Sequence, residues 1–192
     1  MPLNVPNLLT WLRILLIPAF LVVYSVPDTW LTGSQKDLVA TALFAIAAIT
    51  DWLDGYLARV LDQASAFGEF LDPVADKLMV AAALILLVHL KRVDAIIAVI
   101  IIGRELAITA LREWMAKLGK SKSVAVNFLG KVKTFCQMAA ILLLLYDGVL
   151  LGVVDTGRLG TLLIYIAAGL TLWSMVYYLK IALPFMWGRS EG

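Results

Sequence analysis

The sequence predicts an all-α integral membrane protein with six transmembrane helices. Of its 192 residues, 62% are hydrophobic and only 16% are charged, and the mean hydropathy is +0.92. Soluble domains average about 45–50% apolar residues, and a membrane-spanning helix needs about 20 mostly apolar residues. The composition therefore supplies about six spans. It excludes a soluble globular enzyme, a disordered chain and a disulfide-rich secreted domain.

The first of six apolar segments begins near residue 8. No basic stretch precedes it, and Asn7, Thr10 and Arg13 interrupt the apolar region that a signal peptide would need. It is therefore expected to belong to the mature structure rather than to a cleavable signal peptide. Residues 1–9 are expected to lie along the membrane interface before this span.

Five further apolar segments follow. The second ends and the third begins in an acidic stretch, and the fourth contains Arg104 within an otherwise apolar run. The fifth begins beside Lys131 and Lys133, and the sixth leads towards the C-terminus. Each is long enough to cross a bilayer. The expected bounds of the six are 8–26, 38–60, 72–90, 94–116, 132–151 and 159–183.

Charge placement predicts the orientation of these spans. With six spans both termini share one side, and eleven Lys and Arg residues fall on that side or at its boundary against four on the other. The positive-inside rule therefore predicts cytoplasmic termini. We find no repeat or linker, so residues 1–192 are expected to form a single membrane domain. The lone Cys136, the lone His89 and a net charge of +2 give no support to a disulfide, a Cys- or His-based metal site or a nucleic-acid partner.

Four carboxylates, Asp51, Asp54, Asp72 and Asp76, stand within this apolar chain. Each costs about 2.5–3.5 kcal/mol at the centre of a membrane helix, so they need compensation. Asp51 and Asp54 lie about 60° apart around a helix, and Asp72 and Asp76 about 40° apart around the next. The two pairs can therefore face each other and enclose a ligand.

Oxygen-only ligands of this kind favour magnesium, manganese or calcium over zinc or copper. A pair of such cations suits displacement at phosphorus. Simpler interpretations exist for the single residues: Asp72 before Pro73 could cap a helix, and Asp54 could pair with Arg59. They do not jointly explain four acids on two helix faces that also carry small residues.

The acidic stretch resembles the signature of the CDP-alcohol phosphatidyltransferase family, D-x2-D-G-x2-A-R-x8-G-x3-D-x3-D. All eight fixed positions match: Asp51, Asp54, Gly55, Ala58, Arg59, Gly68, Asp72 and Asp76. The resemblance implies six transmembrane helices, an active site near the cytoplasmic face, and a homodimer in the inner (cytoplasmic) membrane of a bacterium. It also implies transfer of a substituted phosphate from a CDP-linked donor to an alcohol, with release of CMP.

The resemblance also implies roles for individual residues. Asp51, Asp54 and Asp72 would bind two divalent cations, which by their oxygen ligands would be magnesium or manganese, and Asp76 would be a ligand, the general base, or both. The residues that would accommodate the cytidine diphosphate are Asn7, Thr10, Gly55, Ala58, Arg59 and Gly68.

Further stretches resemble the bacterial members that use CDP-diacylglycerol as donor and sn-glycerol 3-phosphate as acceptor. They include Gly103-Arg104-Glu105 and Gly130-Lys131-Val132-Lys133-Thr134. The acceptor carries a phosphate, which cations must bind. Arg104 lies inside a span, where an ionised residue indicates a functional site, and Arg112 and Lys131 are expected on the same side. Alternatively, Arg104 pairs with Glu105, and Lys131 serves only the membrane topology.

Other functions remain open to the sequence. The nucleotide motif does not encode the acceptor, so inositol phosphate, serine or phosphatidylglycerol could replace glycerol 3-phosphate. A divalent-cation transporter could use the same carboxylates, but it does not require the Gly-Ala-Arg residues between the two acidic pairs. Intramembrane prenyltransferases also use acidic magnesium sites, but they are typically longer.

Overall fold

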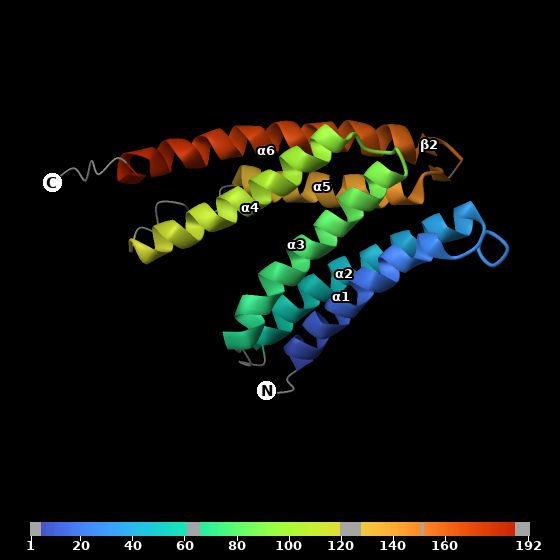
Figure 1. Ribbon diagram of the computed structural model, residues 1–192, viewed down its shortest axis with the longest axis horizontal. Coiled ribbons are helices and arrows are strands. Elements are labelled where there is room, and N and C mark those ends of the chain that lie inside the picture. The colour runs from blue at the N-terminus through green and yellow to red at the C-terminus, as the bar shows by residue number, and fades with distance from the viewer. Residues whose placement is uncertain (1–4, 61–65, 120–127, 151, 187–192) are drawn as a thin grey trace.

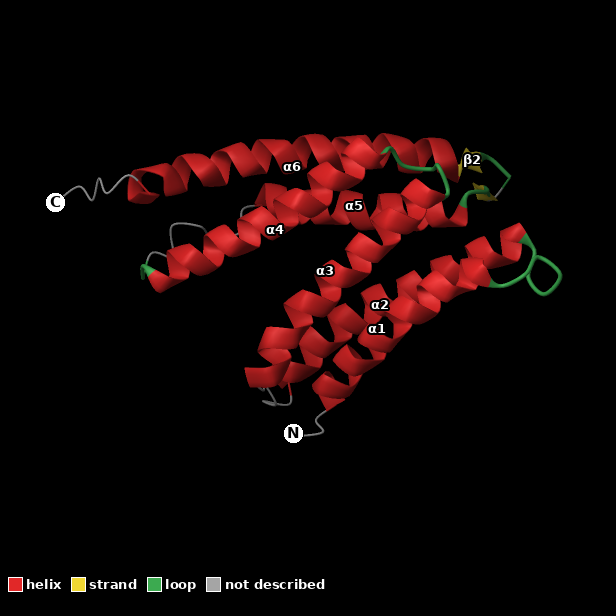
Figure 2. Cartoon of the chain, in the orientation of Figure 1, coloured by secondary structure: helices red, strands yellow, loops and turns green. Residues whose placement is uncertain are grey.

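The computed structural model describes residues 5–60, 66–119, 128–150 and 152–186. Within these ranges the fold is all-α, with six α-helices, one short 3-10 helix and a two-stranded antiparallel hairpin (Figures 1 and 2). The helices are α1 (Val5–Val22), η1 (Val23–Ser25), α2 (Gly33–Val60), α3 (Ala66–His89), α4 (Ala95–Lys117), α5 (Phe128–Tyr146) and α6 (Thr156–Met186). The strands are β1 (Val149–Leu150) and β2 (Val154–Asp155).

Each of the six predicted apolar segments lies in its own helix, so the order of helices is confirmed. The predicted end of the fifth segment, at residue 151, is wrong. Helix α5 ends at Tyr146 because Asp147 adopts a positive φ of 40°, and the chain then turns into the β1–β2 hairpin, where Gly152 has a φ of +72°. Apolar composition alone did not reveal this break. Helix α1 already begins at Val5, so the second half of the proposed interfacial segment is helical.

The helices form two groups that are joined through a shared core (Figure 1). Helix α1 packs against α2 and α3, whereas α6 packs against α5 and α4. Contacts of α2 with α5 and of α3 with α4 connect the groups. The core between them is built from aromatic and aliphatic side chains that are almost fully buried, including Phe20, Phe44, Leu84, Ile101 and Ile141.

The outer faces of the helices are apolar. Large side chains such as Leu15, Ile85, Val99 and Trp173 are more than 60% exposed. Water-soluble proteins rarely expose apolar surface on this scale. Two helical windows in the described part of the chain, Leu8–Ser25 and Thr156–Phe185, are long and apolar enough to cross a membrane. The remaining long helices α2, α3 and α4 carry charged residues that face inwards, as described below.

An ionic cluster ties the helix ends opposite the acidic motif. Arg92, in the α3–α4 loop, donates two hydrogen bonds to Asp37 at 2.7 and 3.0 Å and forms an ion pair with Asp147 at 2.9 Å. It also donates to the carbonyls of Leu144 and Leu145 at the end of α5. Burial by itself lowers the pKa of Arg92, but the hydrogen bonds and charge of Asp37, with the charge of Asp147, outweigh burial and raise it.

Candidate active site

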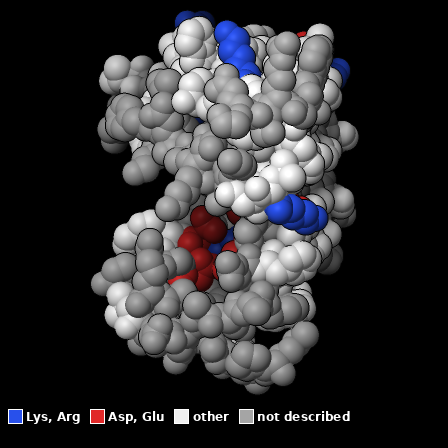
Figure 3. Space-filling model, turned by 90° about the vertical axis from the view of Figure 1, so that its left-hand side faces the viewer, with Lys and Arg blue, Asp and Glu red and all other residues white. Residues whose placement is uncertain are grey.

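The acidic residues of the motif gather at one end of the helix bundle. Asp51 and Asp54 lie near the end of α2, and Asp72 and Asp76 near the start of α3. Figure 3 shows acidic side chains in a hollow on the face where α1 begins and α4 ends. Asp54 is only 3% exposed, whereas the side chain of Asp51 is 45% exposed. Asp51 of α2 and Asp76 of α3 line one small space, so the two acidic helices meet there.

Helix α1 supplies the groups that contact these acids. Arg13, which is 1% exposed, forms an ion pair with Asp51 at 2.8 Å and another with Asp54. Thr10, one turn earlier and equally buried, donates a hydrogen bond to Asp72. Polar groups on one face of α1 thus bind both acidic helices, since residues three apart share a helix face. Thr10 therefore contacts a predicted metal ligand directly, in addition to any contact with nucleotide.

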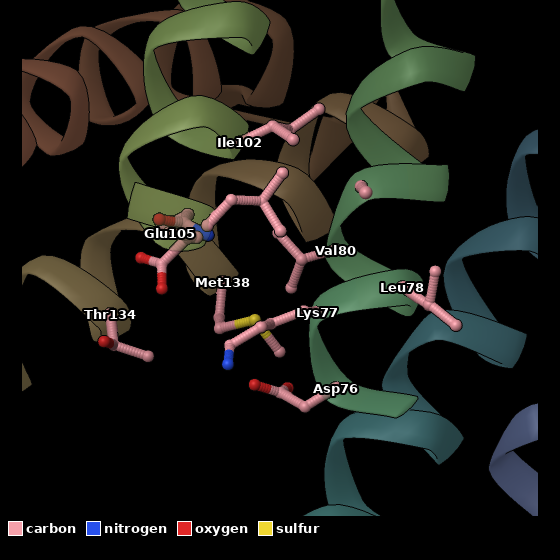
Figure 4. A pocket seen from close by; sticks show the side chains of 11 residues that line it. Asp76, Lys77, Leu78, Val80, Ile102, Glu105, Thr134 and Met138 are labelled. Atoms are coloured by element: carbon pink, nitrogen blue, oxygen red, sulfur yellow. The ribbon is translucent and has the colours of Figure 1, made fainter. Parts of the chain in front are cut away.

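Asp76 lies between two cavities. It lines a small space of about 10 Å³ together with Arg13 and Asp51. It also lines a larger cavity of about 220 Å³ that opens between α3, α4 and α5 (Figure 4), which we call the α3–α5 cavity. The residues that line the α3–α5 cavity are Asp76, Lys77, Leu78, Val80, Ala81, Ile102, Glu105, Leu106, Thr134, Gln137 and Met138. A mostly apolar cavity with a few polar groups is typical of a small-molecule site.

A chain of buried charges borders the α3–α5 cavity on the side of α4. Glu105 forms an ion pair with Lys133 of α5, and Arg104 donates to Glu105 at 3.3 Å. Arg104 also donates to Ser174 of α6 at 2.8 Å and stacks over the ring of Tyr178, 5.7 Å from its centroid. The Arg104–Glu105 pair, the alternative role considered for Arg104, is thus present. The Nε atom of Arg104 is buried without a hydrogen-bond partner among the described residues.

The other predicted site residues are placed unevenly. Arg112 is exposed and lies about 12 Å beyond Arg104 along α4; neither arginine is among the described residues that line the α3–α5 cavity. Gly68 is buried near the start of α3. The side chains of Asn7, Gly55, Ala58, Arg59 and Lys131 lie outside the described residues.

The donor set of the acidic cluster fits a hard divalent cation, because it offers only carboxylate oxygens, with one threonine hydroxyl nearby. The arrangement is not that of a closed metal site: in the described part of the chain, no three acidic, His or Cys side chains converge closely enough to hold a metal ion. Arg13 instead occupies the space between Asp51 and Asp54. These acids would therefore hold cations only with Arg13 as a neighbour.

Three residues of this site, Arg13, Lys133 and Gln137, are not among the site residues predicted from the sequence. A signal existed for two of them, because a charge inside an apolar helix usually has a buried partner. No such signal exists for Gln137, since one polar residue in an apolar helix does not reveal which face it occupies.

The fold and the site define an all-α protein of the membrane type in which an acidic cluster opens on a cavity bordered by buried cations. The eight-residue acidic signature stands at that cluster. The sequence model of the CDP-alcohol phosphatidyltransferase family matches residues 3–173. The chain belongs to this family.

Relatives of known name are similar to the chain over almost its whole length. A protein of Pseudomonas fluorescens is 47% identical, with 98% of this chain and 95% of the relative covered. Proteins of Salmonella typhimurium strain LT2 and Escherichia coli strain K12 are 48% and 46% identical, each with 95% of this chain and 96% of the relative covered. All three are named CDP-diacylglycerol–glycerol-3-phosphate 3-phosphatidyltransferase.

Proposed function

We propose that the chain transfers the phosphatidyl group of CDP-diacylglycerol to sn-glycerol 3-phosphate and releases CMP. The observation that carries this proposal is the position of Asp76, which borders both the acidic cluster and the α3–α5 cavity. A donor diphosphate at the cluster and an acceptor in the cavity would then meet at one carboxylate. The names of relatives 46–48% identical to the chain support the same donor and acceptor.

In the proposed reaction a hydroxyl oxygen of the acceptor attacks the phosphorus that carries the lipid. The bond from this phosphorus to the oxygen of CMP breaks, and CMP leaves. Asp76 accepts the hydroxyl proton. General base catalysis contributes typically about 10²–10⁴-fold, so positioning of the two substrates must supply much of the remaining acceleration.

Divalent cations are part of this proposal. Asp51, Asp54, Asp72 and Asp76 would hold two of them, with magnesium favoured and manganese possible by ligand type. When bound, they would neutralise the diphosphate and the departing phosphate. Support comes from the charge of the acidic cluster, of which Arg13 balances only part.

The acceptor phosphate is proposed to lie near Lys133 and Arg104, and Arg112 and Lys131 are proposed to contribute to its binding. Lys77 lines the cavity itself, and Lys133 and Arg104 both pair with Glu105, which also lines it. Arginine suits phosphate because its planar fork can donate two parallel hydrogen bonds. Asn7, Thr10, Gly55, Ala58, Arg59 and Gly68 are proposed to contact the cytidine diphosphate.

We further propose that all six helices span the inner membrane of a bacterium, with both termini and the active site on the cytoplasmic side. Residues 1–192 would form one membrane domain, and two copies a homodimer. The apolar outer faces of the helices and the burial of Arg13, Arg104 and Lys133 support the membrane arrangement. The homodimer rests on the family resemblance alone, and cross-linking in membranes would test it.

The function is tested with purified protein, Mg²⁺ and CDP-diacylglycerol, by measuring CMP release with a panel of acceptors. Glycerol 3-phosphate should support release, whereas inositol phosphate, serine and phosphatidylglycerol should not. Preference for another member of the panel would refute the acceptor assignment.

The same assay tests the assigned acids. Asp76→Asn should lower kcat by at least about 100-fold, and Asp51→Asn should abolish the response to Mg²⁺. Asp155→Asn, an exposed change in the β1–β2 hairpin, is the matched control and should behave like the wild type. Near-normal turnover of Asp76→Asn would contradict its role as the base.

A further inference from the structure

The amide of Gln137 is buried at the α3–α5 cavity without a complete set of partners. The residue is 4% exposed, and its Oε1 atom has no hydrogen-bond partner among the described residues. Among the described residues, few buried side-chain polar atoms share this property, and Gln137 is the residue of this group that also lines the α3–α5 cavity. A buried acceptor without a donor has lost its hydrogen bonds to water and gained none in exchange, which costs free energy. Such groups therefore usually have a ligand or a water as partner.

The place of Gln137 along α5 relates it to the other polar groups. It lies four residues after Lys133, so both side chains share one helix face about 5.4 Å apart along the axis. Asp76 of α3 and Glu105 of α4 border the same open space (Figure 4). A ligand between Lys133 and Asp76 would therefore have Gln137 within the same cavity, one helix turn deeper.

The cavity favours a small polar ligand at this depth. Its volume of about 220 Å³ is below the range of roughly 300–1,000 Å³ that is usual for drug-sized ligands. Val80, Ile102 and Met138 form apolar walls that cannot hydrogen-bond. Gln137 adds a hydrogen-bonding group without adding charge beside Asp76 and the Glu105–Lys133 pair.

We propose that Gln137 recognises the hydroxyl of the acceptor that does not react. The inference rests on the proposed function, in which glycerol 3-phosphate brings a primary and a secondary hydroxyl into the cavity. The less hindered primary hydroxyl is the nucleophile near Asp76. The secondary hydroxyl donates to Gln137 Oε1, so Gln137 selects a vicinal diol over a simple alcohol phosphate.

The test is a comparison of two acceptors in two forms of the full-length protein. The acceptors are sn-glycerol 3-phosphate and 3-hydroxypropyl phosphate, which keeps the phosphate and the primary hydroxyl but lacks the secondary one. The wild type should prefer glycerol 3-phosphate by about 10-fold or more in kcat/KM, as expected for one buried hydrogen bond. In Gln137→Met, kcat/KM should fall by about that factor with glycerol 3-phosphate and change little with 3-hydroxypropyl phosphate. The ratio of the two kcat/KM values should then approach one.

Two further measurements separate recognition from a structural effect. The KM for CDP-diacylglycerol should stay within about twofold of the wild type in Gln137→Met, because the donor is proposed to bind at the acidic cluster rather than beside Gln137. Gln35→Met, the same chemical change at an exposed residue near the start of α2, should keep the full preference. If Gln137→Met does not accumulate, Gln137→Asn, which withdraws the amide by one methylene, replaces it in the comparison.

Two results would overturn the inference. An unchanged acceptor preference in Gln137→Met would mean that a water satisfies the amide. An equal loss of kcat/KM with both acceptors would mean that Gln137 has a structural role. The proposed function is tested separately in the same assay by the wild type with glycerol 3-phosphate. If the wild type releases no CMP there, the proposed function is wrong, and this inference falls with it.

Discussion

Arg13 carries a charge that neighbouring side chains, rather than water, must balance. Its side chain is 1% exposed and pairs with Asp51 and Asp54. Removal of one partner from a buried ion pair typically costs about 3–5 kcal/mol, because the remaining charge stays uncompensated. Arg13 therefore stabilises the acidic cluster when no cation is bound, and its role should depend on the cation supply.

We expect Arg13→Gln to lower the unfolding temperature clearly in the absence of divalent cations, and Mg²⁺ to restore part of the loss. The reason is that a bound cation can replace the missing positive charge beside Asp51 and Asp54. Thermal unfolding in detergent with and without Mg²⁺ measures both effects. Arg158→Gln is the control, since Arg158 is 91% exposed in its pair with Asp155 and its loss should be worth little. Equal behaviour of the two variants would contradict the role of Arg13.

Lys133 is the second residue whose charge the fold encloses. We expect Lys133→Met to raise the KM for glycerol 3-phosphate by about 10-fold or more and to leave the KM for CDP-diacylglycerol nearly unchanged, because the ammonium pairs with Glu105, which lines the proposed acceptor cavity. Steady-state kinetics with each substrate varied in turn measure the split. Lys117→Met, which breaks an exposed pair with Glu113, should change neither constant. A similar rise in both KM values would remove Lys133 from the acceptor site.

At the scale of elements, the contact between α5 and α6 is the most extensive in the bundle. Gly160 of α6 makes the close approach possible, since an added Cβ would lie 2.7 Å from Leu144 Cγ and 3.2 Å from the carbonyl oxygen of Ala140. Small residues at such crossings let helices pack closely where the surrounding lipid gives no hydrophobic driving force. This contact holds the α5 face that carries Lys133 and Gln137.

Gly160→Ala should therefore destabilise the protein by about 1–3 kcal/mol through overpacking. Gly169→Ala is the matched change in the same helix, where an added Cβ meets nothing within 4 Å. It should be neutral or should stabilise the helix by up to about 1 kcal/mol. Denaturation in mixed micelles, followed by circular dichroism, compares the two. Equal stabilities would show that the α5–α6 crossing tolerates a methyl group at Gly160.

At the scale of the whole molecule, polar clusters lie at opposite ends of the bundle and apolar side chains cover its flanks. The acidic cluster and Lys133 lie at one end, and the Arg92 cluster lies at the other. This distribution matches a bilayer, in which charges are tolerated near the surfaces or inside the bundle. In the proposed topology, the end of α4 and the β1–β2 hairpin face opposite compartments.

Thiol labelling tests this topology. In a Cys136→Ala background, Val153→Cys in the hairpin should react with an impermeant maleimide in intact cells, since Val153 is 85% exposed. Lys117→Cys, at the end of α4, should react only after the membrane is permeabilised. Labelling of Lys117→Cys in intact cells would contradict cytoplasmic placement of the active site.

The sequence predicted the number and order of the helices because apolar runs of sufficient length are a local property. It also predicted that Asp51 and Asp54 share one helix face and Asp72 and Asp76 another, since the helical repeat relates residues that are close in the chain. The end of α5 at Tyr146 escaped prediction, because a positive φ at Asp147 breaks the helix within a run that is still apolar.

By itself, the sequence determined the helical class and the family and located the four acids proposed for the site, all of which depend on local composition and fixed spacing. Only the tertiary structure decided which distant residues complete the site. The contacts of Arg13 with Asp54 and of Lys133 with Glu105 join residues 41 and 28 positions apart. The place of Gln137 at the cavity was likewise decided only by the tertiary structure. All of these contacts depend on how the helices pack and rotate against one another, and the helical periodicity of one segment carries no information on its neighbours.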